Sequence, residues 1–192
     1  MELVQKAFRE GRLADEATWK AVVLITKGKK DYHGIGLVEV MWKVVAENLN
    51  CQLTAFITFH DFLHGFRSGC GTGTATLDAK PLQQLAALRE QILYVIFLDL
   101  HKAYDALDSS RCLDILKGDG VGTRACRIIQ TYWRRLAMMA RAGGYYGTAF
   151  QGAHRVTQGD PLSPNIFNVV VDEVVRHWLT VMVEGSEEWG EC

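Results

Sequence analysis

The sequence has 192 residues, of which 48% are hydrophobic and 22% charged, and this balance excludes a wholly disordered chain. Its 21 basic and 22 acidic residues give a formal net charge of -1, so the overall charge indicates no nucleic-acid partner. The five cysteines are scattered and form no C-x-x-C pair. The sequence contains no stretch of about 18 uncharged apolar residues, so no membrane span is predicted. We therefore expect an intracellular protein, nuclear or cytoplasmic, without a zinc site, a disulfide framework or a membrane partner.

The first quarter of the chain predicts a strand, its return partner and a helix, after a helical lead-in over residues 1–18. Residues 22–25 (VVLI) end at the polar turn KGKK, which predicts a strand and a loop, and residues 34–37 are the expected return partner. Apolar residues then recur at helical spacing over residues 38–50, which predicts a helix with one buried face. The apolar positions of that face are Val38, Met41, Trp42, Val45 and Leu49.

The rest of the chain predicts further helices around a strongly apolar strand. A helix is expected over residues 76–91, with Pro81 either in its first turn or kinking it. Residues 92–100 (ILYVIFLDL) are an almost uninterrupted apolar run, typical of a strand that is covered on both faces. The other expected elements are helices over 109–117 and 123–136, strands with a turn over 137–157, and a last helix opening at Ser163-Pro164. Together they indicate an α+β fold with a few central strands.

The segment FLDLHKAYD, residues 97–105, places Asp99 near the end of the apolar strand. A buried carboxylate is costly unless it meets a cation, and magnesium is usually held by one or two carboxylates together with substrate phosphates. Asp99 is therefore a candidate magnesium ligand for phosphoryl transfer. The alternative is that Asp99 or Asp105 caps the helix that follows.

The segment VTQGDPLSPNIFN, residues 156–168, offers a second set of candidate groups. Gly159 lets a backbone approach a ligand closely, and the Gln158 amide both donates and accepts hydrogen bonds. The alternative is a turn that starts a helix, with Asp160 as a structural cap.

The segment ITKGKKDYHGIGL, residues 25–37, carries Lys27, Lys29 and Lys30 on a tight loop. Such a loop is suited to a triphosphate or a nucleic-acid backbone, and the alternative is a solvated hairpin tip. The glycines of SGCGTGTA fit neither the Walker nor the Rossmann spacing, so they predict a flexible or close-packed loop.

Taken together and in this order, these segments resemble the reverse transcriptases of retroelements, the group that includes group II intron and non-long-terminal-repeat enzymes. FLDLHKAYD resembles the first catalytic-aspartate motif of that family, and VTQGDPLSP-IFN resembles its motif for positioning template and nucleotide. HGFRSGCGTGTA resembles the G-F-R-x-G-R-G-T stretch between fingers and palm, and ITKGKKDYHGIGL resembles the fingers loop that contacts the incoming nucleotide. The resemblance spans roughly residues 19–180. It implies polymerase fingers over residues 19–91 and a partial right-hand palm over 92–192, with a small central antiparallel sheet packed with helices and an incomplete C-terminus.

The resemblance also implies a role for each matching residue of the first motif. Asp99 matches the first metal-binding aspartate, with the backbone carbonyl of Leu100 as a further ligand, and the implied metal is Mg²⁺ with Mn²⁺ as an alternative. Tyr104 matches the aromatic residue that excludes a ribose 2′-hydroxyl, because a rigid ring under the sugar leaves no room for the extra oxygen. Asp105 matches an acidic position with a structural role.

The other motifs imply binding roles. Gln158 and Gly159 match residues that line the nucleotide pocket, and Lys27 and Lys29 fall in the triphosphate-facing loop. Arg67 matches the arginine of the G-F-R motif, which is expected to face the template. The implied partners are an RNA template, a DNA primer and dNTPs, with no obligatory protein partner.

The sequence departs from the family pattern at several positions. His33 stands where the fingers loop usually carries Arg, which weakens the expected triphosphate clamp, because His is mostly neutral at pH 7. Cys70 stands where the G-R-G-T pattern has Arg, and His154-Arg155 replaces the usual R-G. The family's second aspartate pair lies in a Y/F-x-D-D motif after the long helix, and no D-D dipeptide occurs in this sequence. The resemblance therefore implies that the chain stops short of that motif, and we expect that by itself it does not extend a primer.

Two other classes of function stay open at this point. The first is a non-catalytic retroelement remnant that binds RNA or a protein partner, which the missing aspartate pair favours. The second is an unrelated α/β magnesium enzyme, such as a nucleotidyltransferase, in which the carboxylates of Asp99 and Asp160 converge.

Overall fold

The structure, a computed structural model, describes residues 2–11, 13, 15–26, 32–142, 144–152 and 156–188. The chain divides into two compact units that interleave along the sequence. The first unit combines Met1–Thr58 with Lys102–Val170, and the second combines Phe59–His101 with Val171–Cys192. This division differs from the expected fingers and palm segments, whose boundaries stay a prediction.

The first unit begins with short helices and a β-hairpin. Helix α1 (Glu2–Glu10) and the 3-10 helix η1 (Asp15–Thr18) form the expected lead-in. Strands β1 (Trp19–Thr26) and β2 (Tyr32–Val38) pair antiparallel, so the expected hairpin is confirmed. Consecutive β-branched and aliphatic side chains in β1 favour this extended backbone.

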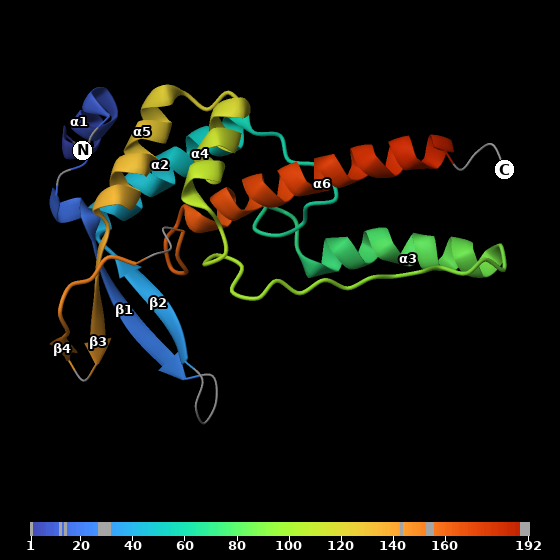
Figure 1. Cartoon of the computed structure of the whole chain (residues 1–192), viewed down its shortest axis with the longest axis horizontal. Helices are drawn as coiled ribbons and strands as arrows, with labels where there is room; N and C mark the ends of the chain where they lie inside the picture. The colour runs from blue at the N-terminus through green and yellow to red at the C-terminus, as the bar shows by residue number, and fades with distance from the viewer. Residues whose placement is uncertain are drawn as a thin grey trace. The chain divides into compact units, whose positions relative to one another are not determined.

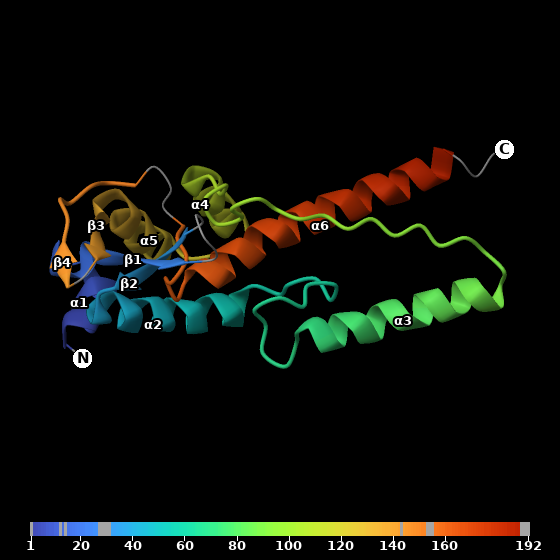
Figure 2. The same cartoon turned by 90° about the horizontal axis from the view of Figure 1, so that it is seen from below.

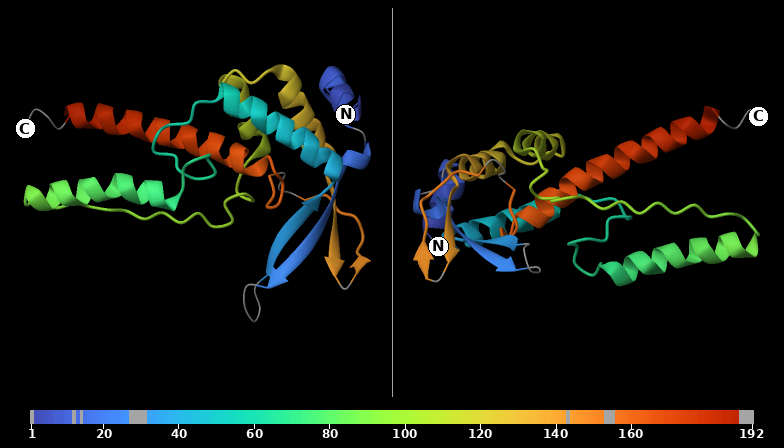
Figure 3. Two further views of the ribbon diagram at one scale, coloured as in Figure 1. Left: turned by 180° about the vertical axis from the view of Figure 1, so that it is seen from behind. Right: turned by 60° about the horizontal axis from the view of Figure 1, so that its bottom comes forward.

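A second pair of strands completes a four-stranded sheet. Strand β3 (Ala137–Ala142) lies parallel to β1, and the short strand β4 (Tyr145–Tyr146) runs antiparallel to β3. The order across the sheet is β2-β1-β3-β4, and Figure 3 shows it from behind. The expected α+β class is therefore confirmed, but the sheet is mixed rather than wholly antiparallel, because β1 and β3 run in the same direction.

Helices α2 (Val40–Phe56), α4 (Ser109–Gly118) and α5 (Thr123–Arg135) supply most of the core of the first unit. Figures 1 and 3 show α2 and α5 side by side at one end of the sheet. All three helices were expected, and each buries residues that share one face, as apolar periodicity predicts. In α2 the buried residues are Trp42, Val45, Ala46, Leu49 and Leu53, and in α5 they are Ala125, Cys126, Ile128, Ile129, Tyr132 and Trp133.

The second unit holds α3 (Thr72–Leu88) and the C-terminal part of α6 (Ser163–Glu188), a helix that starts in the first unit. Both helices were expected, but α3 begins before residue 76, so Pro81 lies inside it rather than in its first turn. Thr74 explains the earlier start, because its hydroxyl accepts the N–H of Gly71 at 2.9 Å and caps the helix. Among the described residues, no helix is long and apolar enough to span a membrane.

Residues 92–100 differ most from expectation. In the described part of the chain they pair with no strand, and Figures 1 and 2 show them as an extended trace. Their large apolar side chains are exposed, with Phe97 at 91% and Leu98 at 87% relative accessibility. A strand forms only where a neighbouring backbone takes up its N–H and C=O groups, and the described residues supply no such neighbour. The prediction of a covered strand here is therefore wrong for this structure.

Replacing Ile92 and Ile96 with lysine is expected to reduce self-association of the isolated chain. Exposed, extended apolar segments pair with one another between molecules, and two added charges interrupt that pairing. Sedimentation velocity at several protein concentrations measures the change. The exposed residues Gln83 and Gln84 of α3, replaced by lysine, give a control with the same added charge. Equal self-association of the two double variants would show that net charge, and not this segment, controls it.

Candidate functional site

A tight turn over residues 157–163 forms the centre of the candidate site. The Ser163 hydroxyl closes the turn, because it donates to the carbonyl oxygen of Thr157 at 2.8 Å and accepts the Thr157 N–H at 3.2 Å. At the tip, Gly159 has φ +93°, a backbone conformation that favours glycine. The expected opening of α6 at Ser163 therefore coincides with a closed loop that presents Gln158 to solvent.

The turn packs backbone to backbone on strand β2. The Gly36 N–H donates to the carbonyl oxygen of Gln158 at 2.9 Å. A Cβ added at Gly159 would lie 2.3 Å from the Gly36 oxygen, far inside van der Waals contact. Glycine at position 159 is therefore required both by its backbone conformation and by this close approach.

The Asp160 carboxylate is buried and holds the turn from within. Its Oδ1 accepts the Leu162 N–H and its Oδ2 accepts the indole Nε1–H of Trp42, each at 3.0 Å. Burial raises the pKa of Asp160, while the hydrogen bonds from Leu162 and Trp42 and the charge of Lys20 oppose that rise. A carboxylate used in this way is a structural anchor, so the structure supports the structural alternative for Asp160 over a metal-binding role.

Trp42 of α2 and Tyr132 of α5 stack beside Asp160. Their ring centroids are 3.5 Å apart, the rings are nearly parallel at 5°, and both residues are 0% exposed. Burial raises the pKa of Tyr132, and the nearby Asp160 carboxylate adds to the rise. The buried Tyr132 hydroxyl has no hydrogen-bond partner of good geometry among the described residues. The stack joins α2 to α5, and the hydrogen bond from Trp42 to Asp160 joins α2 to the turn.

Lys20 of β1 is a buried cation at the same place, only 3% exposed. Its side chain crosses Gly36: a Cβ added there would lie 2.1 Å from Lys20 Cε and 2.7 Å from Nζ. Burial lowers the pKa of Lys20 to about 8, while the carboxylates of Asp160 and Asp105 oppose the fall. Lys20 was not among the predicted site residues. The signal in the sequence is a single lysine in an otherwise apolar strand, and that pattern also fits a lysine that reaches solvent.

Tyr104 and Asp105 lie in the turn at the start of Lys102–Val170, the second segment of the first unit. Its ring packs on Phe167 of α6, with centroids 5.5 Å apart and planes at 55°. Partial burial raises the pKa of Tyr104. Tyr104 and the Gln158–Gly159 turn belong to the same compact unit.

Asp99 lies in the exposed apolar segment of the second unit. Within the described residues its carboxylate has no hydrogen-bond or ion-pair partner. The alternative that Asp99 or Asp105 caps the next helix is wrong, because Asp108 is the cap of α4 and accepts the Arg111 N–H at 2.8 Å. Asp99 belongs to a different unit from Tyr104, so its role as a metal ligand of the nucleotide site stays a prediction.

The described residues fit a magnesium ion in part. Asp99 offers one exposed carboxylate and Leu100 a backbone carbonyl, and magnesium is often held by one or two carboxylates together with substrate phosphates. Over the ranges that the structure describes, no three His, Cys, Asp or Glu side chains gather into a group that could hold a metal. A complete metal site therefore needs carboxylates in addition to Asp99.

Arg67 lies in the second unit and is partly buried. Its Nη1 donates to the carbonyl oxygens of His60 at 3.0 Å and Leu63 at 2.8 Å. Asp172 holds the same loop, because its carboxylate accepts the His60 N–H and the Nε–H of Arg176, each at 2.6 Å. One nitrogen of Arg67 therefore stabilises its own loop, and the expected template contact stays a prediction.

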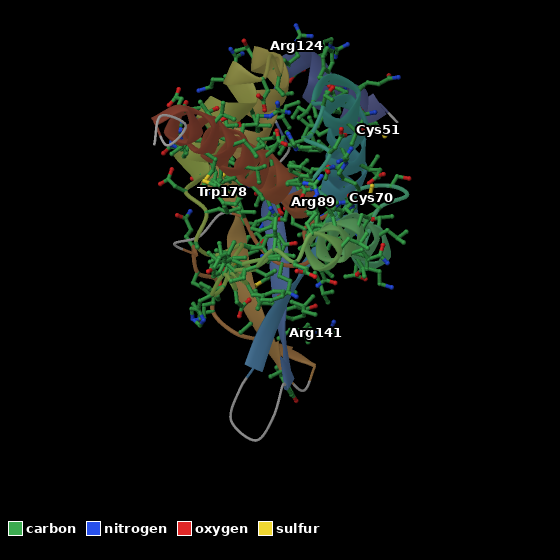
Figure 4. The ribbon with its side chains drawn as sticks, turned by 90° about the vertical axis from the view of Figure 1, so that its right-hand side faces the viewer. Cys51, Cys70, Arg89, Arg124, Arg141 and Trp178 are labelled. Atoms are coloured by element: carbon green, nitrogen blue, oxygen red, sulfur yellow. The ribbon has the colours of Figure 1, made fainter. Side chains whose placement is uncertain are left out.

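The lysines of the expected fingers loop and a cavity of the first unit are not part of the site around the Gln158–Gly159 turn. Lys27 and Lys29 fall outside the described residues, as does Lys30, so the expected triphosphate contacts stay a prediction. A cavity of about 470 Å³ opens in the first unit between α1, α2 and the start of α5, and none of the predicted site residues lines it. Arg124 lines this cavity, and Figure 4 shows it away from Arg141, which lies on the sheet.

The family model described as reverse transcriptase (RNA-dependent DNA polymerase) matches residues 25–186, which is most of the chain. The chain belongs to this family. The chain is similar to Pol polyproteins of R2 elements, which indicates the non-long-terminal-repeat type. Membership in an RNA-directed DNA polymerase family removes the unrelated magnesium enzyme as an alternative.

The chain is 26% identical over 152 residues to the "Retrovirus-related Pol polyprotein from type-2 retrotransposable element R2DM" of Drosophila melanogaster, a match over 78% of this chain and 14% of that protein. It is 31% identical over 108 residues to the "Retrovirus-related Pol polyprotein from type-1 retrotransposable element R2" of Nasonia vitripennis, over 56% of this chain and 10% of that protein. The chain thus spans a small part of the length of these relatives. Reverse transcriptases as a family act on an RNA template with a DNA primer and generally use divalent metal ions.

Proposed function

We propose that this chain forms the nucleotide- and template-binding part of an R2-like reverse transcriptase, in which deoxynucleotides are added to a DNA primer opposite an RNA template. The observation that carries this proposal is the attachment of the Gln158–Gly159 turn to strand β2 through the Gly36 N–H. This attachment fixes the exposed Gln158 amide on the expected fingers hairpin, where it can donate to and accept from a nucleotide.

The residues of this chain act by positioning the nucleotide. The Tyr104 ring, held against Phe167, excludes the 2′-hydroxyl of a ribonucleotide and so favours a deoxynucleotide. Gln158 and Gly159 line the pocket for the base and sugar. Lys27 and Lys29 neutralise the triphosphate, and Arg67 contacts the template strand.

Asp99 and the Leu100 carbonyl are the proposed contribution of this chain to metal binding. Magnesium, or manganese in its place, stabilises the attacking and leaving oxygens of phosphoryl transfer when it is bound. Asp99 alone cannot bridge two ions at about 3.5 to 4 Å separation, and the 192-residue sequence contains no D-D dipeptide. We therefore propose that this chain alone does not extend a primer, whereas a longer chain that supplies the second aspartate pair does.

Binding and extension assays with the purified chain test the proposal. We expect it to bind an RNA template annealed to a DNA primer with an affinity that falls steeply as salt rises, because phosphate contacts release counterions. Fluorescence anisotropy at several salt concentrations measures binding, and a denaturing gel measures extension with Mg²⁺ and dNTPs. Extension by this chain alone would contradict its proposed inactivity. Binding that is absent, or that hardly depends on salt, would contradict its nucleic-acid role.

A non-catalytic retroelement remnant is the second candidate function. His33 and Cys70, which stand in place of family arginines, favour it. Such a remnant would bind RNA with no response to nucleotides. Adding the dNTP complementary to the next template base should strengthen primer–template binding if the nucleotide pocket is intact, and should leave binding unchanged for a remnant.

A further inference from the structure

Helix α2 holds the Gln158–Gly159 turn at two places within the first unit. In the first turn of the helix, the Trp42 indole donates to Asp160 Oδ2 at 3.0 Å. About two helical turns further on, Asn50 Nδ2 donates to the carbonyl oxygen of Pro161, also at 3.0 Å. Side chains with this spacing lie on the same broad face of a helix. One rigid element therefore contacts two successive residues that follow the turn tip.

The Asn50 amide also reaches helix α6. Its Oδ1 accepts the Nδ2–H of Asn165, in the first turn of α6, at 2.9 Å. A backbone carbonyl only accepts hydrogen bonds, so the nitrogen of the Asn50 amide faces Pro161 and its oxygen faces Asn165. A carboxylate of the same shape would keep the bond from Asn165 but would have no hydrogen to donate to Pro161. Both halves of the amide are therefore used at position 50.

The contact at Pro161 complements the bonds that hold the rest of the turn. The Ser163 hydroxyl closes the turn on itself, and the Gly36 N–H attaches the Gln158 carbonyl to the edge of β2. Asn50 fixes the point at which the turn passes into α6. Because the turn is closed, a displacement at Pro161 moves it as a body and carries the exposed Gln158 amide with it.

We propose that Asn50 is a positioning residue of the nucleotide site, whose side-chain amide sets the position of the Gln158–Gly159 turn by joining α2 to Pro161 and to α6. The effect on nucleotides rests on the proposed function, whereas the position of the turn does not. Asn50 acts through the turn and not by contact with the nucleotide. Its loss should weaken nucleotide binding more than primer–template binding, because the latter depends on phosphate contacts made by basic residues.

Asn50→Asp is the sharpest variant, because it exchanges one NH₂ group for an oxygen and keeps the shape of the side chain. Asn48→Asp, at an exposed position of the same helix, is its matched control. It makes the same chemical change and adds the same charge. A carboxylate at position 48 can still accept the Nε2–H of Gln52, as the Asn48 amide does at 2.8 Å.

Hydrogen exchange followed by NMR tests the position of the turn without any nucleotide. The Gly36 amide reports on the turn, because it donates to the Gln158 carbonyl at 2.9 Å. We expect Asn50→Asp to speed its exchange about tenfold relative to the amide of Ile129, in the core of α5, and Asn48→Asp to leave this ratio unchanged. A general loss of stability would speed both amides alike. An unchanged ratio in Asn50→Asp overturns the proposal.

Nucleotide binding supplies the second measurement. Fluorescence anisotropy follows binding of the chain to a primer–template while the complementary dNTP is titrated in the presence of Mg²⁺. We expect Asn50→Asp to raise the half-maximal dNTP concentration about tenfold, and Asn48→Asp to keep the wild-type value. The two variants should bind the primer–template alone with equal affinity, because they carry the same charge. A wild-type dNTP response in Asn50→Asp, or an equal loss of both affinities, overturns the positioning role.

The two measurements separate failure of this proposal from failure of the proposed function. If the wild-type chain shows no response to the dNTP, the proposed function fails, and hydrogen exchange still decides whether Asn50 positions the turn. If Asn50→Asp does not fold, as judged by circular dichroism, Asn165→Ala decides it, because this variant removes the donor to Asn50 Oδ1. Faster exchange of Gly36 relative to Ile129 in Asn165→Ala supports the proposal, and an unchanged ratio overturns it.

Discussion

Replacing Trp42 with alanine is expected to lower the free energy of unfolding of the first unit by about 3 to 5 kcal/mol. The indole is 0% exposed and stacks on Tyr132 at 3.5 Å, so its removal leaves a cavity between α2 and α5. It also removes the donor to Asp160 Oδ2, which leaves a buried carboxylate with one hydrogen bond fewer. Urea-induced unfolding followed by far-UV circular dichroism measures the change.

Two further variants separate the causes of this loss. Trp42→Phe keeps an aromatic ring against Tyr132 but removes the indole N–H, so we expect an intermediate loss of about 1 to 3 kcal/mol. Trp178 of α6, labelled in Figure 4, is 60% exposed, and Trp178→Ala should change the free energy of unfolding by about 1 kcal/mol or less. A loss for Trp42→Ala no larger than that for Trp178→Ala would contradict the assigned role of the stack.

Most of the helices and the hairpin could be predicted because their signals are local. Helix α2 shows apolar residues at helical spacing, and β1 is a short β-branched run that ends at a polar turn. The start of α3 was expected at residue 76 rather than at Thr72, because the Gly-rich segment before it predicts a loop. The cap that decides the start is the hydroxyl of Thr74, whose side chain also fits a loop.

The segment 92–100 shows where local signals fail. Its composition is typical of a covered strand, but a strand is defined by its pairing with a neighbour, and no neighbour is encoded within the segment itself. In the described part of the chain the segment stays unpaired and its side chains exposed. The parallel pairing of β1 with β3 was missed for the same reason, because the two strands are far apart in the sequence.

Some residues of the candidate site could be predicted from local motifs, whereas others depend on contacts between distant parts of the sequence. Gln158, Gly159 and Tyr104 could be singled out from motifs, and the structure places them in one compact unit. The role of Asp160 as a buried acceptor was left open, because its donors come from α2 and from its own turn. The single lysine of β1 was an ambiguous signal for Lys20, since its burial depends on the space left by Gly36 of the next strand.

Replacing Gly159 with alanine is expected to destabilise the first unit by about 3 kcal/mol or more, through two separable effects. The first is backbone strain, because φ is +93° and a side chain disfavours that conformation by about 1 kcal/mol. The second is contact: the new Cβ would lie 2.3 Å from the oxygen and 3.0 Å from the nitrogen of Gly36. To relieve it the turn must move away from β2, and the hydrogen bond from the Gly36 N–H to Gln158 is then lost.

Gly120 provides the matched control for this variant. Its φ is +84°, close to that of Gly159, but a Cβ added there meets no atom within 4 Å. Gly120→Ala should therefore show the strain alone, about 1 kcal/mol in urea-induced unfolding. The difference in free energy of unfolding between the two variants measures the contribution of the close contact between the turn and β2. Faster hydrogen exchange of the Gly36 amide in Gly159→Ala alone would place the damage at that contact, because this amide is the donor to Gln158. Equal losses in both variants would mean that the turn is not held by this approach, and the pocket proposed around Gln158 would lose its support.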